Sequence, residues 1–595
     1  MIDDSFQIFF SGVSFHKSGG RRVVEQGTTS PMATQCTCYA KLITFLERLQ
    51  DAALVTFKEE KFDPKRFVDL SLKRDLPVVE NAFDQLSWND DGSANVEQLQ
   101  RFIEEYCDGE GADLVYYEPP DFVNEPAGFL PKVTNPEVRT WGLQVHFLWK
   151  KLSRRVSERV FEQPFLHTLL PLPEAVIIPG ARFREIYYWD SYWVIRGLLA
   201  SKMYDTAKGI VKNLIHMANV CGFVPNGSRA YYTNRSQPPL LSAMVRELHD
   251  KTGEYELVEM VLPTLLAEHH FWNSDKHMAQ IQDCHGNLLT LNRYYAFWNK
   301  PRPESATIDK RSASSFCTAD KKQQFYREVA SAAESGMDFS SRWMRVQSDF
   351  TSLATTSVLP VDLNIFILKM EIDIAFFANI VGERDTANYF LDLSKARKSA
   401  IDTVFWNDKS GQWLDYWLED GSSLSTEIWQ EKNQNHTVFA SNFTPLWIDL
   451  FHSDTPLVEK VVESLSGSGL ILPAGLSTSL VDSGEQWDYP NGWAPLQHMI
   501  VEGLARCGTK KAQSLAEEVA IKWIRANYSA FNKTGAMHEK YDVRKCGEFG
   551  GGGEYNPQTG FGWSNGVALS FLEEIGWPEN REINCLDYSS LNAKY

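Results

Sequence analysis

Hydrophobic residues recur at helical spacing along most of the chain. Leu241, Met244, Val245 and Leu248 fall on one face of a predicted helix, which two prolines precede and Gly253 follows. The same spacing recurs in segments separated by short loops: 191–203, 204–220, 238–253, 254–273, 361–382, 384–407, 492–508 and 512–531. Short loops between helices imply antiparallel hairpins, and strong two-residue alternation is missing from the sequence. The pattern therefore predicts a mainly α protein.

Loops at the ends of these helices share an unusual composition. They combine aromatic rings with arginines, carboxylates and amides, and they span residues 179–193, 226–239, 294–305, 333–343, 406–417, 485–495 and 554–566. Periodicity alone allows either an open solenoid or a closed ring of helix pairs. Because loops that converge on one end of a ring would form one pocket, their shared composition favours the ring.

The stretch 179–193 indicates what such a pocket would bind. A core segment would bury rings without charges, and a solvated helix face would carry charges without a wall of rings. A sugar uses both, because its C–H faces stack on Trp and Tyr while its hydroxyls bond to Arg, Asp and Glu. Aromatic residues make up 13% of the chain, including 18 Trp, which fits a ring-lined cleft.

Length and composition are those of a soluble globular protein: 595 residues, 43% hydrophobic and 23% charged. The net charge of −18 and the lack of basic runs exclude nucleic acid as a partner. The apolar stretch 6–15 is too short to span a bilayer. Lys369, Glu371 and Asp373 interrupt the longer stretch 364–382, so we expect a buried helix there.

The cysteines give no sign of a metal site or a disulfide framework. Nine are scattered at positions 36, 38, 107, 221, 284, 317, 507, 546 and 585. Their odd number leaves at least one thiol without a partner within the chain, and we expect all of them to be unlinked. Six glycosylation sequons begin at asparagines that would matter only on a secretory route: Asn226, Asn234, Asn435, Asn442, Asn527 and Asn532.

Two of the loops carry a specific family resemblance. The stretches "PGARFREIYYWDSYW" and "QWDYPNGWAP" resemble the signature motifs of the trehalases, inverting glycoside hydrolases with an (α/α)6 toroid. "NRSQPP", "PRPES", "ESGMDFSSRW", "EKYDV" and "GGGGEYNPQTGFGWSNGV" match the family in the same order, so the resemblance covers roughly residues 160–580. Residues 39–160 look most like the plant members. The resemblance implies hydrolysis of α,α-trehalose to two glucose molecules, with no organic cofactor and no catalytic metal.

Carried over position by position, the resemblance implies roles for individual residues. Asp338 falls on the general acid and Glu539 on the general base, the pair that protonates the bridging oxygen and activates water. Sugar-binding or cavity-lining roles fall on Arg182, Trp189, Asp190, Asn226, Arg235, Gln237, Arg302, Glu304, Trp487, Asp488, Trp493 and Glu554. The residues alone would not select either carboxylate: they favour Asp338 as the cap of a helix that begins at the next residue and Glu539 as a solvated strand residue.

Three positions depart from the family pattern. Ala181 stands in place of a second Gly, Met337 in place of the Trp before the acid, and Ala306 in place of a Tyr. Loss of a ring beside Asp338 is expected to change how strongly burial raises the pKa of that carboxyl. The glycine run 550–553 lacks the Lys of a phosphate loop, and we expect it to form a mobile lid over the sugar.

We expect residues 1–38 to be poorly ordered and residues 39–595 to form a single catalytic domain. Within it, residues 39–160 would form a helical extension packed on the toroid. Plant trehalases that resemble this chain face the cell exterior, but no signal peptide or membrane anchor is evident in the sequence. Oligomeric state is not predicted.

Three other functions remain compatible with a toroid of this kind. They are another α/α-toroid glycosidase, a disaccharide phosphorylase and a catalytically inactive sugar sensor. The sensor is disfavoured because both carboxylates and all three arginines are present together, whereas a degenerate site should have lost at least one. Phosphate-dependent turnover would identify a phosphorylase.

Overall fold

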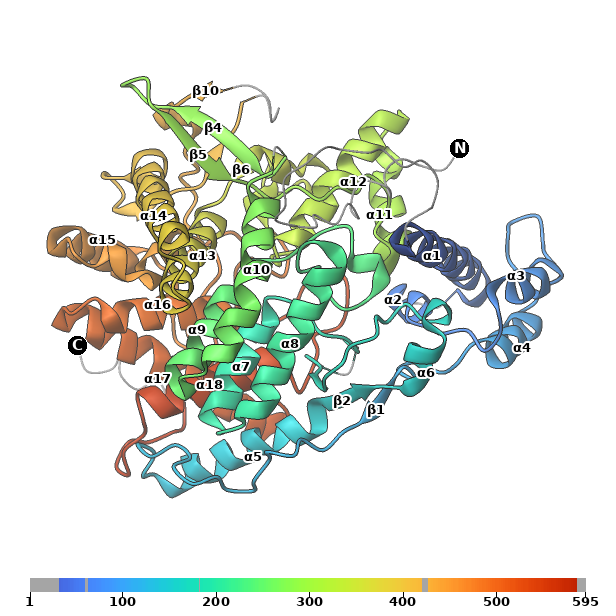
Figure 1. Ribbon diagram of the computed structural model, residues 1–595, viewed down its shortest axis with the longest axis horizontal. Helices are drawn as coiled ribbons and strands as arrows, with labels where there is room; N and C mark the ends of the chain where they lie inside the picture. The colour runs from blue at the N-terminus through green and yellow to red at the C-terminus, as the bar shows by residue number, and fades with distance from the viewer. Residues whose placement is uncertain (1–30, 59–61, 181, 275, 420–425, 586–595) are drawn as a thin grey trace.

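The computed structural model describes residues 31–58, 62–180, 182–274, 276–419 and 426–585 (Figure 1). Helices make up most of the secondary structure in these residues, and the strands are short. The prediction of a mainly α protein is confirmed. In the described part of the chain, no helix is both long enough and apolar enough to cross a membrane.

Six helical segments of the described chain form a closed inner ring. Contacts run around it in the order α7 (Asp190–Ala200), α9 (Leu241–Thr252), α13 (Val361–Ile380), the 3₁₀ segment η11 (Ala440–Trp447), α16 (Ala494–Arg506) and α18 (Gly562–Glu574). Helix α18 in turn packs against α7. This closure distinguishes a ring from an open solenoid.

A second layer of helices packs around this ring. It comprises α5 (Pro136–Leu152), α8 (Tyr204–Cys221), α10 (Tyr255–Trp272), α14 (Arg384–Val404), α15 (Thr455–Gly467) and α17 (Lys510–Thr534). All eleven residues of α7 are buried, whereas α14 buries only one face, as expected for an inner and an outer helix. Short connections lead from α7, α9, α13 and α16 to the outer helices that follow them, as the hairpin pattern predicts, whereas longer loops return the chain to the inner ring.

The end of α9 illustrates how the sequence sets these helices. Gly253 follows the last helical residue with φ of 68°, a left-handed conformation that glycine adopts without a steric penalty. Leu241, Met244 and Leu248 on the inward face are all buried. The predicted helix and its end are both confirmed.

The N-terminal helices lie at one end of the molecule in Figure 1, where the first four are blue and α6 is teal. They are α1 (Pro31–Phe57), α2 (Lys65–Val68), α3 (Leu76–Asp84), α4 (Val96–Tyr106) and α6 (Glu158–Glu162). Helix α1 contacts α11 (Ala306–Ser312), which precedes α12 (Ala319–Glu334). Helix α2 contacts the 3₁₀ turn η5 (Pro303–Ser305). The N-terminal helices therefore pack directly on the loops that follow α10.

Two outcomes qualify the predicted domain boundaries. Residues 31–38 were expected in the poorly ordered segment, yet they belong to helix α1, and residues 1–30 lie outside the described residues. Most buried hydrophobic residues, from Tyr39 to Ile583, belong to one cluster, and a second small cluster contains Ala296, Trp298 and Ala330. The assignment of residues 39–595 to a single domain stays a prediction.

Short sheets link the helices. Strands β1 (Leu114–Tyr116), β2 (Ser153–Val156) and β3 (Val176–Ile177) form an antiparallel sheet, and β4 (Met278–Gln282) pairs with β5 (Leu288–Asn292) and β10 (Glu427–Ile428). The other pairs are β6 (Val358–Leu359) with β9 (Tyr416–Trp417), β7 (Trp406–Asn407) with β8 (Gln412–Trp413), β11 (Ile471–Leu472) with β12 (Gly475–Leu476), and β13 (Asn491–Gly492) with β14 (Tyr541–Asp542). The last pair fixes the loop before α16 beside the loop before α18.

The expectation of unlinked cysteines is wrong for one pair. Cys546 and Cys585 form a disulfide, with Cα atoms 5.8 Å apart. Cys546 lies in the loop after β14, and Cys585 lies beyond α18. Because 39 positions separate them, no short sequence spacing could reveal the bridge.

The stretch 364–382 lies within the buried helix α13, as predicted, apart from its last two residues. Its charges are compensated by partners. Lys369 Nζ donates to Asp373 Oδ2 at 2.6 Å, and Arg397 Nε donates to Glu371 Oε1 at 2.8 Å. Paired charges explain how this helix tolerates burial.

Candidate active site

A cavity opens at one end of the ring, where loops precede inner helices. The loops before α7, α9, α13, α16 and α18 contribute to its wall, together with the turn before α11. It contains about 710 Å³ of space, part of it open to solvent.

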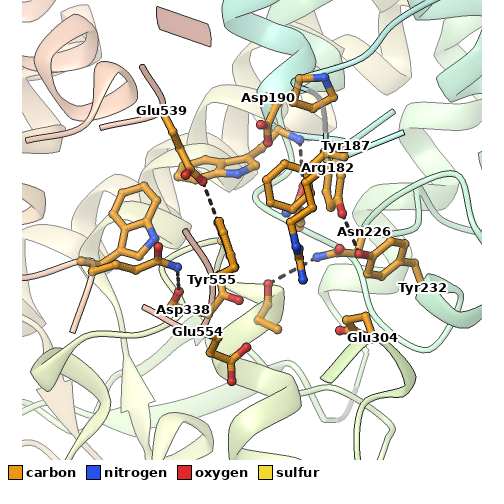
Figure 2. A pocket seen from close by; sticks show the side chains of 18 of the residues that line it. Arg182, Tyr187, Asp190, Asn226, Tyr232, Glu304, Asp338, Glu539, Glu554 and Tyr555 are labelled. Atoms are coloured by element: carbon orange, nitrogen blue, oxygen red, sulfur yellow. Dashed lines mark hydrogen bonds between the residues drawn. The ribbon is translucent and has the colours of Figure 1, made fainter. Parts of the chain in front are cut away.

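The structure brings into this one cavity thirteen of the fourteen residues to which the resemblance gives catalytic, sugar-binding or cavity-lining roles, all except Asp488: Arg182, Trp189, Asp190, Asn226, Arg235, Gln237, Arg302, Glu304, Asp338, Trp487, Trp493, Glu539 and Glu554. The side chains labelled in Figure 2 come from the segments before α7, α9, α11, α13 and α18 and from Asp190 at the start of α7. Convergence of residues so distant in sequence follows from the closed ring, since each loop ends at the same rim.

Indole rings form one wall of the cavity. Trp487 and Trp493 are stacked with ring centroids 4.0 Å apart and an interplanar angle of 2°. Trp189 lies 5.7 Å from Trp487, and Trp563 stands edge-on to Trp189 at 5.8 Å. These rings offer flat apolar surface of the kind on which a sugar ring packs.

Asp338 enters the cavity from the segment between α12 and α13. The side chain is 33% exposed, and it forms part of the cavity lining. Burial raises the pKa of Asp338 to about 7; Arg302, whose Nη1 lies 3.8 Å from Oδ2, opposes this rise, and Glu554 adds to it. Gln486 donates its amide N–H to the backbone oxygen of Asp338. A carboxyl group with this pKa retains a proton in many molecules at neutral pH.

Glu539 enters from the segment just before β14 and is almost completely buried. The Tyr555 hydroxyl donates to Oε1 at 2.6 Å (Figure 2), and the backbone N–H of Gln558 donates to Oε2 at 3.1 Å. Trp563 Nε1 donates to the backbone oxygen of Glu539 at 3.0 Å. Three donors therefore fix both the carboxylate and its backbone.

Each cavity arginine is held by at least one carboxylate. Arg302 Nε and Nη2 donate to Asp309 at 3.0 and 2.7 Å, and Nη2 also donates to Glu554 at 3.0 Å. Arg235 Nη2 donates to Glu304 at 2.6 Å. Burial alone would raise the pKa of Glu304, but Arg235 and Arg302 outweigh it and lower that pKa. The guanidinium groups are therefore oriented before any ligand binds.

Asp190 differs from these paired carboxylates. Burial raises its pKa well above the usual range, and the nearby Glu539 and Asp338 carboxyl groups add to the rise. Its pKa therefore favours a protonated carboxyl, which can donate a hydrogen bond to a sugar hydroxyl.

Two amide side chains hold the loops of the cavity together. Asn226 Nδ2 donates to the backbone oxygens of Ser236 and Ala333, both at 3.3 Å. Gln237 Oε1 accepts from the backbone N–H of Trp189 at 3.2 Å. These bonds join the loops before α7 and α9 to each other and to the last turn of α12.

Asp488, Met337 and Ala306 lie outside the set of residues that line the cavity. Asp488 is buried, and its carboxylate accepts from Ser341 N–H at 2.7 Å and from three serine hydroxyls. Met337 is buried against Arg342, whose Nη1 lies 3.4 Å from its sulfur, and Ala306 begins α11. Ala181 lies outside the described residues. The pKa of Asp338 is thus raised with Met337 in place of the usual ring.

Part of the glycine run is explained by close packing. Gly553 has φ of 87°, and a Cβ there would lie 2.7 Å from Gln486 Oε1. Glycine is required both by this conformation and by this approach. The expected lid motion stays a prediction.

Sequence reasoning did not select several residues that also line the cavity: Tyr187, Tyr232, Gln486, Tyr555 and Trp563. All five belong to the loops singled out by composition. Assigning every residue of these loops to the cavity wall would have included all five, although their individual contacts could not be inferred from the sequence. In the described residues, no group of three or more His, Cys, Asp or Glu side chains is arranged to hold a metal ion.

A stacked aromatic wall, oriented arginines and two carboxyl groups in different environments are typical of a glycoside hydrolase. Comparisons with known proteins agree with this class. A family model described as trehalase matches residues 59–576. The chain therefore belongs to the trehalase family, as its motifs predict.

Individual relatives show how far this similarity extends. The chain is 57% identical over 547 residues to a trehalase of Arabidopsis thaliana, covering 91% of this chain and 87% of the relative. It is 54% identical to a probable trehalase of Oryza sativa subsp. japonica, covering 91% and 97%. Identity to a Homo sapiens trehalase is 36%, covering 93% and 91%.

The fold is also found in a solved structure. Neutral trehalase Nth1 from Saccharomyces cerevisiae is similar with a TM-score of 0.57 at 23% identity, covering 73% of this chain and 94% of that one. The predicted toroid is confirmed.

Proposed function

We propose that this chain hydrolyses α,α-trehalose with inversion of configuration, with Asp338 as general acid and Glu539 as general base. Family membership supports the substrate and the reaction. The contrast between the two carboxyl groups supports their roles. Burial favours the protonated form of Asp338, whereas two donors hold the acceptor oxygens of Glu539.

In the proposed reaction, Asp338 transfers its proton to the oxygen that bridges the two glucose units. The bond between this oxygen and one anomeric carbon breaks. Glu539 accepts a proton from a water molecule, whose oxygen bonds to the same carbon from the opposite face. One glucose leaves with inverted configuration, and exchange with solvent returns both carboxyl groups to their starting states.

The rest of the cavity would bind and orient the disaccharide. The stacked Trp487 and Trp493 offer a flat apolar surface to a sugar ring. Arg235 and Arg302 can donate to sugar hydroxyls while their carboxylate partners hold them in place. Orientation before binding lowers the entropic cost of reaching the reactive geometry.

Proton NMR of the products tests the stereochemistry. Both linkages of trehalose are α, so an inverting enzyme should release equal amounts of β-glucose and α-glucose before mutarotation mixes them. Early release of α-glucose alone would indicate a covalent intermediate and make Glu539 a nucleophile. The same assay with inorganic phosphate tests the phosphorylase alternative, because hydrolysis should be independent of phosphate.

A further inference from the structure

Helix α1, outside the ring, is connected to the cavity through Gln50. This residue is fully buried, and its amide Nε2 donates to the backbone oxygens of Pro64 and Pro303 at 2.9 and 3.0 Å. Pro303 lies between Arg302 and Glu304, two residues of the cavity wall. One side chain therefore joins the short segment 62–64 to a cavity loop.

Asp63, in that segment, holds an arginine of the cavity. Arg182 Nε and Nη2 donate to Asp63 Oδ2 and Oδ1, each at 2.7 Å. Two parallel charge-assisted bonds match the planar guanidinium group and fix its orientation. The two side chains are 16% and 37% exposed, so solvent weakens the charge attraction more than it weakens this geometric effect.

The orientation of Arg182 affects a residue that contacts the proposed base. Its guanidinium carbon lies 4.5 Å from the centroid of the Tyr555 ring, and the Tyr555 hydroxyl donates to Glu539. The backbone N–H of Arg182 donates to the side chain of Gln558, whose own backbone N–H donates to Glu539. The contacts of Asp63 therefore extend through Arg182 to the residues that hold Glu539.

Lys65, two positions after Asp63, anchors this segment in the protein interior. Its Nζ lies 2.8 Å from Glu185 Oε1 and 2.6 Å from Asp69 Oδ2. Glu185 also accepts from the hydroxyl of Tyr187 at 2.6 Å, and Tyr187 lines the cavity. Removal of the Lys65 charge would leave two buried carboxylates with Arg229 as their remaining cation, so Asp63 is the better position for a test.

We propose that Asp63 is a positioning residue for sugar binding, which it supports by holding Arg182 in place. The N-terminal helices would then complete the active site as well as cover the ring. The inference rests on the proposed function, because it assumes that the cavity binds the sugar. An arginine that is fixed before the substrate arrives need not be ordered during binding. Loss of the Asp63 carboxylate should therefore raise KM more than it lowers kcat.

The test compares three variants on the full chain. Asp63→Asn keeps the size of the side chain but removes its charge, Asp63→Glu keeps the charge, and Asp84→Asn is the matched control. Asp84 belongs to the same N-terminal region, pairs with Arg48 at 2.6 Å and is 59% exposed. The measurements are kcat and KM for trehalose, the inhibition constant of the glucose-shaped inhibitor 1-deoxynojirimycin, and Tm.

Asp63→Asn should lower kcat/KM about tenfold or more, mainly through KM, and weaken inhibitor binding by a similar factor. Asp63→Glu should recover part of the loss, and Asp84→Asn should behave as the unaltered chain. Gln50→Met, which removes the amide bonds to Pro64 and to Pro303, should also raise KM.

Unchanged KM and inhibitor affinity in Asp63→Asn, or a fall in Tm alone, would overturn the inference. Failure of the proposed catalytic roles would look different. Turnover retained by Asp338→Asn or Glu539→Gln would reject those roles, while inhibitor affinity would still report on Asp63.

Discussion

Replacing Asp338 by Asn removes an ionisable proton while nearly keeping the shape of the side chain. Because burial raises the pKa of Asp338 to about 7, about nine-tenths of the molecules carry this proton at pH 6 and about one-tenth at pH 8. If the protonated form is the acid, kcat/KM for trehalose should fall about tenfold between these pH values. Asp338→Asn should lose about a hundredfold or more in kcat at pH 6.

A second substrate separates acid catalysis from other effects of the substitution. In α-glucosyl fluoride the leaving group is a weak base that departs without a proton, so Asp338→Asn should hydrolyse this compound at a rate near that of the unaltered chain. The alkaline fall in activity should also be smaller for this substrate. Glu539→Gln should be inactive on both substrates, because each needs an activated water molecule.

Stability supplies an independent check on the sign of the pKa shift. The pKa of Asp338 in the folded protein lies above the ordinary value of about 4, so ionisation is disfavoured by folding. The stability that the folded protein has with a protonated Asp338 is fully present below pH of about 4. It is lost as the pH rises through about 7. Asn does not ionise, so the Tm of Asp338→Asn should rise relative to the unaltered chain between pH 5 and pH 8.

Either of two results would refute this reasoning. One is a pH profile for trehalose without an alkaline fall near pH 7. The other is a loss of fluoride hydrolysis in Asp338→Asn as large as the loss of trehalose hydrolysis, which would show that the variant disturbs binding or the base. Asp84→Asn serves as a control in both assays, since Asp84 is an exposed residue of α3.

Three further predictions follow from the contacts around the site. Lys540 donates to Gln486 at 2.6 Å, and Gln486 donates to the backbone oxygen of Asp338. Lys540→Met should therefore lower kcat about tenfold, and unchanged steady-state kinetics would contradict this. Cys585→Ser opens a disulfide between residues 39 positions apart and should lower the free energy of unfolding by about 4 kcal/mol; an equal denaturation midpoint would contradict it. Glycans added on a secretory route should be confined to Asn435 and Asn532, because the other four sequon asparagines are buried; peptide mass spectrometry would reveal any exception.

The sequence was most informative about which residues meet. Seven loops of similar composition at helix ends predicted a ring, and the ring brings the predicted residues together. Hydrophobic spacing located the helices because one face of each had to be buried, as in α9. Motif order supplied the family, which composition alone could not have done.

The sequence was least informative about partners. Nothing in the composition of the loops pairs Arg182 with Asp63, 119 positions away, or Glu539 with Tyr555. Such pairs depend on how separate elements pack, and many of the 77 acidic residues of the chain could satisfy an arginine equally well. The disulfide was missed for the same reason, because its spacing resembles that of unrelated cysteines.

The charges of the cavity bear on whether water or phosphate is the second reactant. Three arginines line the cavity, but five carboxyl groups line it as well, and each arginine is already paired with a carboxylate at 3.0 Å or less. A phosphate anion would have to displace these carboxylates or lie beside them, and both are electrostatically unfavourable. A neutral disaccharide and a water molecule require no such rearrangement, since their hydroxyls can accept from the arginines and donate to the carboxylates. The arrangement of charge therefore favours hydrolysis over phosphorolysis on grounds independent of the family resemblance.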